Sequence, residues 1–322
     1  MTPGRVALAT CSALPDLDDD ERLVIPALAA LGVDAIPLVW DDPSAGWAEH
    51  ELVVVRSTWD YSDRRDEFLR WGASLRGVLN PLPVLSWNTD KVYLRELAAA
   101  GIAVVPTAWI EPGSPVDSIS LPDGEVVVKP AVSAGARNTS RYHAGEETAA
   151  RSHVERLVAA GRTVMVQPYV ASVDNAGETA LIYLDASFSH AVRKGPLLQG
   201  DQAADDLLWV PEEITARDAA DDELALAERA LDAVPFDRDD LLYARVDVVR
   251  GPDGTPMVLE VELAEPSLFL AHGECAATRL AAGIARRLRH GAVTTPGAQP
   301  PRDQRRQTRP QPQSRPESSC RG

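Results

Sequence analysis

The feature that most constrains the fold is a predicted β-hairpin between residues 243 and 267. Two runs of alternating apolar residues, 244–249 and 257–263, flank a Gly-Pro-Asp-Gly turn at 251–254. Residues two apart in a strand share a face, so each run has an apolar face and a polar face. The pattern therefore predicts an antiparallel ribbon with one side buried and the other side bearing charges.

Four charged residues fall on the polar face of this hairpin. A turn centred between residues 253 and 254 places Asp247 opposite Glu260, and the same register places Arg245 opposite Glu262. Side chains paired in this way lie about 5 Å apart across the strands. Carboxylates this close need a cation between them, and clusters of oxygen ligands suit Mg²⁺ that bridges to phosphate. The alternative is a solvated polar face on an edge hairpin.

Lysine is rare in this chain. Of 32 basic residues only three are lysines, and they are Lys91, Lys129 and Lys194. Arginine is used wherever a generic cation suffices, so each lysine is a candidate for a position that a planar guanidinium does not fit. A compact ammonium fits between phosphate oxygens, which makes all three candidate phosphate ligands.

Composition excludes several classes of protein. The net charge of −16 argues against nucleic acid or an anionic membrane as a general partner. No apolar stretch approaches the roughly 20 residues of a transmembrane helix. The three cysteines are far apart and have no zinc-binding spacing, which favours a cytoplasmic protein. A chain of 322 residues is long enough for two or three lobes.

The first part of the chain, residues 5–86, alternates strands with helices. Runs such as 6–10, 33–39 and 51–56 read as buried strands, and this order predicts a small parallel sheet. Ligands bind at the carboxyl ends of such strands. Arg56 lies at one of these ends, so it either faces a substrate or makes a loop contact.

The middle of the chain contains a second set of phosphate-binding signals. The strand 125–130 carries Lys129 and runs into the small-residue loop 131–136, whose backbone N–H groups could cover phosphates. The loop is neither a P-loop nor a Rossmann motif. The buried strand 163–170 ends in a linker suited to a flat heterocycle. Beyond it we expect a long mobile loop at 196–210.

In this order, the features resemble the ATP-grasp superfamily, of the glutathione synthetase and D-alanine–D-alanine ligase type. The resemblance implies an α/β fold with α+β lobes, in which ATP binds between two lobes behind a βαβ pre-ATP-grasp domain. The implied division is a substrate-side domain at 1–86, a central lobe at 87–172 and a C-terminal lobe at 173–290. A disordered tail rich in proline and arginine is expected at 291–322.

The resemblance also assigns roles to individual positions. It implies two catalytic residues, namely Arg245, the transition-state arginine, and Lys194. Nucleotide contacts are implied for Lys91, Lys129, Ser133, Gly135, Gln167, Pro168, Tyr169 and Val170, with Asp174 or Glu178 near the ribose. The implied metal ligands are Asp247, Glu260 and Glu262, holding one or two Mg²⁺ ions for which Mn²⁺ could substitute. Candidate substrate contacts are Arg56, Arg193 and Ser267.

One position departs from the family pattern. The family usually has E-x-N on the second strand of the hairpin, and this chain has Glu260-Val261-Glu262. A carboxylate can replace an amide as a hard oxygen ligand, but it adds negative charge beside the γ-phosphate.

Several longer segments, among them VVVRSTWDY and VVVKPAVSAGARNT, are similar to a bacterial group that includes the cyclo-ligase of D-cycloserine biosynthesis. The resemblance implies an ADP-forming carbon–nitrogen ligase that activates a small amino-acid-like carboxylate as an acyl phosphate. The substrate could be O-ureido-serine, and a homodimer is a candidate state because relatives are often dimers. A small-molecule kinase on the same fold, and a nucleotide-binding protein inactivated by Glu262, are the alternatives.

Overall fold

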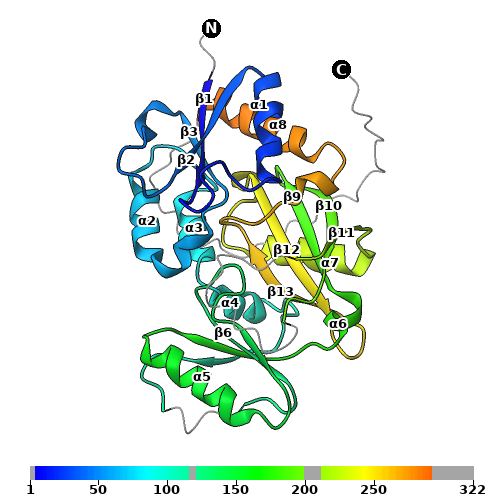
Figure 1. The fold of residues 1–322 in the computed structure, drawn as a ribbon. Coiled ribbons are helices and arrows are strands. Elements are labelled where there is room, and N and C mark those ends of the chain that lie inside the picture. The colour runs from blue at the N-terminus through cyan, green and yellow to red at the C-terminus, as the bar shows by residue number, and fades with distance from the viewer. Residues whose placement is uncertain (1–3, 116–120, 199–211, 292–322) are drawn as a thin grey trace.

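A computed structural model of the chain describes residues 4–115, 121–198 and 212–291. Nearly all of the loop expected to be mobile at 196–210, and of the tail expected to be disordered at 291–322, lies outside these residues. The described chain forms three β-sheets, and helices cover them (Figure 1).

The first sheet contains the N-terminal strands. Its order is β2-β1-β3-β4 and all of its pairings are parallel, as the alternation of strands and helices predicted. The strands are β1 (Gly4–Thr10), β2 (Val33–Val39), β3 (Leu52–Val55) and β4 (Val78–Leu79). The helices that follow them are α1 (Val24–Ala30), α2 (Arg65–Ser74) and α3 (Leu82–Asn88).

Two of these helices have a proline in the first turn. The 3₁₀ turn η1 (Glu21–Leu23) comes directly before α1, which starts at Val24. Pro26 then lies in the first turn of α1, where a missing N–H costs no hydrogen bond. Pro83 likewise lies in the first turn of α3, a position that tolerates proline.

The second sheet is antiparallel and lies at the far end of the molecule in Figure 1. Its order is β5-β8-β6-β7, with β5 (Ala108–Ile110), β6 (Val126–Pro130), β7 (Ser140–Tyr142) and β8 (Val164–Pro168). Helix α5 (Glu147–Ala159) packs on it through a core that includes Val128, Val154 and Val166. The short helix α4 (Tyr93–Ala99) belongs to the segment that joins this sheet to the first.

The third sheet carries the predicted hairpin. Its order is β11-β10-β9-β12-β13 and it is antiparallel throughout. The strands are β9 (Glu178–Leu184), β10 (Ser187–Lys194), β11 (Ile214–Arg217), β12 (Tyr243–Arg250) and β13 (Pro256–Glu262). Helices α6 (Ser172–Ala176), α7 (Asp221–Ala233) and α8 (Ala276–His290) accompany them. Strand β11 and helix α6 were not predicted from the sequence.

The register of the hairpin is the predicted one. Arg245 pairs with Glu262 and Asp247 with Glu260. The pairing shifts by one residue after Asp247, where a bulge places Val248 opposite Val258. The bulge lies beyond the charged pairs, so all four charged side chains keep to one face.

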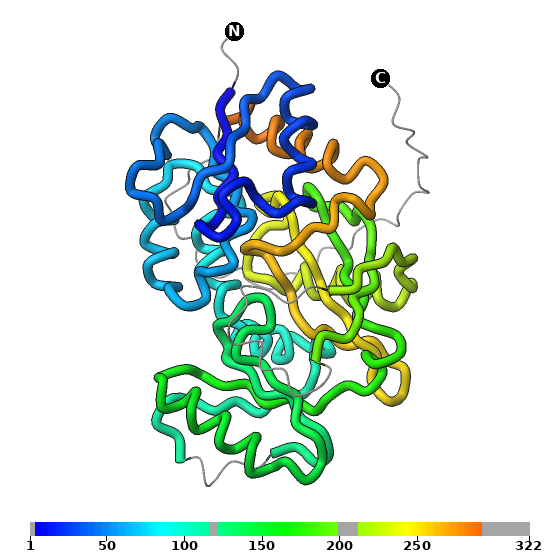
Figure 2. The backbone as a smooth tube through the Cα atoms, viewed as in Figure 1, coloured from blue at the N-terminus to red at the C-terminus, as the bar shows by residue number. Residues whose placement is uncertain are grey.

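The two ends of the described chain share one hydrophobic core. Helix α8 packs against the N-terminal sheet and α1, with Leu280 and Ile284 in the same buried cluster as Val6 and Leu28. Figure 2 shows this return of the C-terminal part of the trace to the N-terminal strands. This packing joins the hairpin sheet to the first sheet. The contact lies on the side of the first sheet where Arg56 follows β3.

Candidate active site between the three sheets

A cavity of about 410 Å³ lies where the three sheets meet, and most of the predicted site residues line it. The nucleotide candidates on its wall are Lys91, Lys129, Ser133, Gly135, Gln167, Pro168, Tyr169, Val170 and Glu178. The catalytic, metal and substrate candidates on its wall are Lys194, Arg245, Asp247, Glu260, Glu262 and Ser267. The three that do not line it are Arg56, Asp174 and Arg193.

Arg245 organises the hairpin side of the cavity. Its Nε donates to Asp247 Oδ1 at 2.8 Å and its Nη2 to Asp247 Oδ2 at 3.0 Å. Nη2 also donates to Glu262, and Nη1 to the carbonyl of Ser267 at 3.1 Å. Burial alone would raise the pKa of the Asp247 carboxyl, but Arg245 and Lys194 hold it below its ordinary value. Burial raises the pKa of Glu262 to about 7, against the opposing effect of Arg245.

Lys194 lies among three carboxylates. Its ammonium is 3.1 Å from Asp247, 3.2 Å from Glu178 and 3.7 Å from Glu212. Burial lowers the pKa of the ammonium, but Asp247 and Glu178 hold it well above its ordinary value. Glu212 was not predicted as a site residue, because no sequence motif marks it. Lys194 is therefore a fixed cation at the end of the metal-candidate face.

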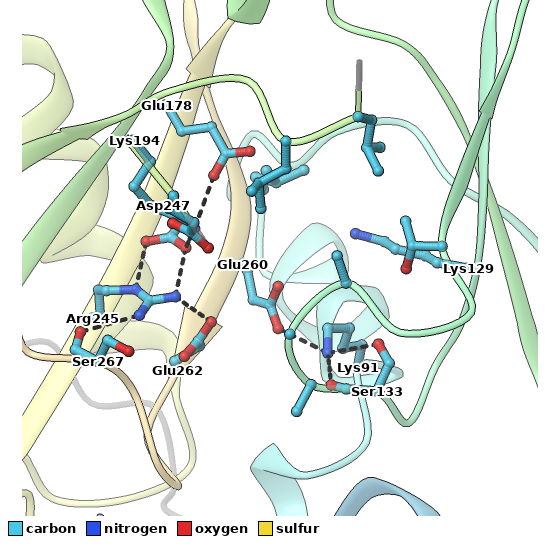
Figure 3. Close-up of a pocket in the computed structure, with 18 of the residues that line it drawn as sticks. Lys91, Lys129, Ser133, Glu178, Lys194, Arg245, Asp247, Glu260, Glu262 and Ser267 are labelled. Atoms are coloured by element: carbon cyan, nitrogen blue, oxygen red, sulfur yellow. Dashed lines mark hydrogen bonds and ion pairs between the residues drawn. The ribbon is translucent and has the colours of Figure 1, made fainter. Parts of the chain in front are cut away.

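Lys91 joins the hairpin to the small-residue loop. Its Nζ lies 2.9 Å from Glu260 Oε1 and donates to the carbonyl of Ser133 at 2.7 Å. Its backbone N–H donates to the carbonyl of Ala131 at 2.9 Å. The loop that was expected to cover phosphates is thus attached to the hairpin through one lysine, as Figure 3 shows.

Lys129 differs from the other two lysines. It points into the cavity from β6, facing the hairpin (Figure 3). It is 8 % exposed, and its ammonium forms no hydrogen bond or ion pair with the residues that the structure describes. Burial lowers the pKa of this ammonium, against the opposing charges of Glu260 and Glu178, and the positive charges of Lys91 and Lys194 lower it further. A buried cation without an anion is costly, so this position is prepared for an anionic ligand.

The segment expected to bind the heterocycle forms the opposite end of the cavity. Tyr169 lies under Arg141, whose Cζ is 3.5 Å from the ring centroid. The Tyr169 hydroxyl donates to Asp174 Oδ1 at 2.6 Å, and Arg141 also binds that carboxylate at 3.1 Å. These bonds hold Asp174 outside the cavity. Of the two ribose candidates only Glu178 lines the wall.

The other two predicted contacts outside the cavity are also held by protein groups. Arg56 is 1 % exposed and forms two 2.6 Å hydrogen bonds with the buried carboxylate of Glu21. Arg193 donates to the carbonyl of Ala176 at 3.1 Å and lies 3.5 Å from Glu213. Neither side chain therefore lines the cavity, and the substrate contact named for Arg56 and Arg193 stays a prediction. A strand end does not reveal that a buried acid takes the guanidinium.

Two side chains that were not predicted as site residues support the hairpin. They are the amide of Asn88 and the phenol of Tyr93. On the outer edge of β13 the segment 103–105 forms a bridge at Val258, and Asn88 and Tyr93 bind the backbone of Val261. The Tyr93 hydroxyl donates to the carbonyl of Val261 at 2.7 Å and accepts from its N–H at 3.0 Å. The sequence shows an asparagine and a tyrosine, but these residue types do not reveal which backbone groups they bind.

The carboxylates of the hairpin are ligands of the type that Mg²⁺ prefers, but they do not form a complete coordination site on their own. In the described part of the chain, no group of three or more acidic, histidine or cysteine side chains is arranged to hold a metal ion. Asp247, Glu260 and Glu262 each contact a basic side chain instead. Mg²⁺ is commonly held by one or two carboxylates together with water and substrate phosphates, and the donor set suits that mode.

Comparisons with known proteins agree with this geometry. Residues 6–82 match the family described as D-cycloserine synthetase DcsG, N-terminal domain. The cycloserine biosynthesis protein DcsG of Streptomyces lavendulae is 39% identical over 304 residues, covering 89% of this chain and 99% of that protein. The crystal structure of D-cycloserine synthetase DcsG superposes with a TM-score of 0.79 at 37% identity, covering 88% of this chain and 100% of that chain.

More distant structures share the fold. A RimK domain ATP-grasp protein from Sphaerobacter thermophilus has a TM-score of 0.62 at 22% identity, covering 87% of this chain and 99% of its own. D-alanine–D-alanine ligase from Bacillus anthracis has a TM-score of 0.59 at 13% identity, covering 89% and 98%.

These findings confirm the predicted ATP-grasp fold, and the protein is an ATP-binding, ADP-forming ligase. The chain belongs to the DcsG family. Among the described helices, none is long and apolar enough to cross a bilayer.

Proposed function

We propose that this ligase activates the carboxylate of a small amino-acid-like substrate as an acyl phosphate. A nitrogen nucleophile then displaces phosphate, and the reaction releases ADP. The substrate we propose is O-ureido-serine, closed to cycloserine, because the similarity to DcsG proteins extends over nearly the whole of their length. ATP would bind between the lobes at 87–172 and 173–290, with residues 1–86 on the substrate side.

The observation that carries the proposal is the ammonium of Lys129. It is buried on the cavity wall without an anionic partner among the described residues, while Lys91 lies nearby with Glu260. An ATP polyphosphate supplies the missing negative charge. A phosphate chain between Lys129 and the hairpin would place the γ-phosphate near Arg245, where charge develops during transfer.

Each side chain then has a positioning or charge-neutralising task. Lys129 and Lys91 would bind the polyphosphate, and Arg245 would stabilise the transferring phosphoryl group. Asp247, Glu260 and Glu262 would hold Mg²⁺, which when bound neutralises β- and γ-phosphate oxygens. The loop that contains Ser133 would exclude water, because an acyl phosphate hydrolyses readily.

The test is ADP release from Mg-ATP with O-ureido-serine and a panel of amino acids. The expected result is ADP formation that depends on substrate, with cycloserine detected by mass spectrometry. Hydroxylamine should trap the acyl phosphate. A stable phosphorylated product in place of a ligation product would show that the protein is a small-molecule kinase. Nucleotide binding with no ADP release on any substrate would leave a nucleotide-binding protein without catalysis and reject the proposal.

The metal assignment has its own test. Asp247→Asn and Glu260→Gln should abolish turnover and weaken Mn²⁺ binding measured by electron paramagnetic resonance in the presence of ADP. The exposed-residue variant Glu155→Gln is the matched control. Activity retained in both Asp247→Asn and Glu260→Gln would reject the assignment.

A further inference from the structure

Glu265 is a buried acid on the cavity wall that the mechanism above does not use. It follows the hairpin by three residues, is 8 % exposed and lines the cavity. Its Oε2 is buried and has no hydrogen-bond partner among the described residues. A buried carboxylate oxygen without a hydrogen-bond donor lowers the stability of the folded state, so Glu265 destabilises the fold in the absence of a ligand.

The backbone around Glu265 is held by three side chains from distant parts of the chain. Trp59 Nε1 donates to the carbonyl of Glu265 at 3.2 Å, and Arg56 donates to the carbonyl of Pro266. Arg245 Nη1 donates to the carbonyl of Ser267 at 3.1 Å. These bonds fix the backbone segment that carries the Glu265 carboxyl group. Arg56, for which the sequence left a substrate contact and a loop contact open, thus makes a loop contact to the segment that lines the cavity.

Tyr61 supplies a second polar atom at the same place. It is 3 % exposed and lines the cavity, and its hydroxyl and the Glu265 carboxyl each shift the pKa of the other. Packing of its ring against Phe68, with centroids 5.1 Å apart, fixes its orientation. The side chains of Glu265 and Tyr61 thus both line the cavity.

The described basic side chains leave Glu265 without an ion pair. The charge of Lys91 lowers the pKa of Glu265, but the Lys91 ammonium is bound to Glu260 and to the Ser133 carbonyl. Burial raises the pKa of Glu265 to about 8, with the charge of Glu262 as the next cause. A cation brought in by a ligand would reverse this cost and stabilise the ionised carboxylate.

We propose that Glu265, assisted by Tyr61, binds the ammonium group of the amino-acid-like substrate and selects for substrates that carry one. The inference rests on the proposed function, since it concerns the carboxylate substrate of the same site. An ammonium has three N–H donors, and the Glu265 and Tyr61 oxygens are acceptors for two of them. A metal ion is a poorer fit, because a single carboxylate and a neutral phenol make a weak ligand set.

The experiment compares one substrate with its analogue in which hydrogen replaces the α-amino group. The pair is O-ureido-serine and its deamino form or, if another amino acid supports faster ADP release, that amino acid and its deamino form. Wild type and Glu265→Gln are assayed for kcat/KM on both members. Loss of a charged hydrogen bond should reduce the preference for the amino substrate about 10- to 100-fold.

Three further measurements make the result decisive. The KM for ATP should stay within about twofold of wild type, because Glu265 is not placed on the nucleotide. Glu155→Gln, an exposed change of the same kind on α5, should leave the preference unchanged. Tyr61→Phe should reduce the preference by a smaller factor, and it tests the site if Glu265→Gln does not fold.

The failures are distinguishable. If wild type releases no ADP with any substrate, the proposed function is rejected, and this inference with it. If wild type is active and folded Glu265→Gln or Tyr61→Phe keeps the full preference for the amino substrate, only the ammonium site is rejected.

Discussion

The carboxamide of Asn88 binds the backbone of Val261 in the edge strand that carries the acidic pair. Nδ2 donates to the Val261 carbonyl at 2.7 Å, and Oδ1 accepts from the N–H groups of Leu263 at 2.6 Å and Ala264 at 3.1 Å. These backbone groups have no neighbouring strand to pair with. Since Val261 separates Glu260 from Glu262, one buried amide sets the position of both carboxylates.

Replacing this amide should weaken both folding and function. Asn88→Ala removes three hydrogen bonds, and we expect the free energy of unfolding to fall by about 1–3 kcal/mol. ADP release should fall further than the loss of folded protein explains, because Glu260 and Glu262 lose their support. Urea unfolding and ADP release by the folded fraction measure the two effects. The exposed Asn175→Ala is the control, and a variant as stable and active as this control would contradict the role of Asn88.

Replacing Lys129, unlike replacing Asn88, should not lower the free energy of unfolding. Lys129→Met removes a buried ammonium that has no partner among the described residues, so the free energy of unfolding should stay constant or rise by about 1 kcal/mol. Affinity for Mg-ADP, measured by calorimetry, should fall at least about tenfold. Arg76→Met removes an exposed cation and should leave affinity unchanged. Lower stability with unchanged affinity would show that Lys129 is structural.

The hairpin register could be predicted from sequence because it depends on local physics. A two-residue period and a Gly-containing turn determine which side chains lie opposite, and the pairing of Asp247 with Glu260 followed from them. The bulge after Asp247 could not be predicted, since nothing in the adjoining valines indicates it. The supports of β13 were also out of reach, because Asn88 precedes Val261 by 173 residues.

For Arg56 the backbone position could be predicted from the sequence, but the partner of its side chain could not. Its place at the end of a parallel strand was predicted correctly, and a ligand site is the usual neighbour of such an end. Its side chain nevertheless binds Glu21 and the Pro266 carbonyl. Which partner a buried guanidinium takes depends on how η1 and the segment after the hairpin come together, and this is tertiary information.

Asp63 connects the loop over the cavity to the N-terminal domain. Its carboxylate lies 2.7 Å from Arg137 in the loop and 3.4 Å from Arg162. Asp63→Asn should change stability by less than about 1 kcal/mol, because the pair is partly exposed. ATP hydrolysis without ligation should rise, since the loop loses an attachment that helps to exclude water.

The measurement for Asp63 is the ratio of ADP released to ligated product. We expect the ratio to move from near one toward several in Asp63→Asn. The exposed Asp66→Asn, on the adjoining turn of α2, is the matched control. An unchanged ratio would mean that the attachment does not govern water access.

Glu265 gives a pH dependence of stability whose sign follows from its raised pKa. Between its ordinary value of 4.5 and its folded value of about 8, the folded state holds a proton that the unfolded state has lost. Its contribution is therefore present below pH 4.5 and is lost as the pH rises toward 8. Relative to Glu265→Gln, wild type should lose at most about 1.4 kcal/mol per pH unit across this window. Parallel urea unfolding curves at pH 5 and pH 8 measure this, and a constant difference between the two proteins would contradict it.

Glu262 is the position where this chain leaves the usual E-x-N pattern, and its carboxylate accepts a hydrogen bond from Arg245. If the extra carboxylate serves as a hard oxygen ligand, Glu262→Asn should raise the Mg²⁺ concentration for half-maximal rate about 3- to 10-fold. The maximal rate should stay within about tenfold of wild type, because an amide oxygen still coordinates Mg²⁺. Titration of ADP release against Mg²⁺, with Glu155→Gln alongside, gives both values. A wild type that is inactive and a Glu262→Asn variant that gains turnover would establish instead that this carboxylate blocks catalysis.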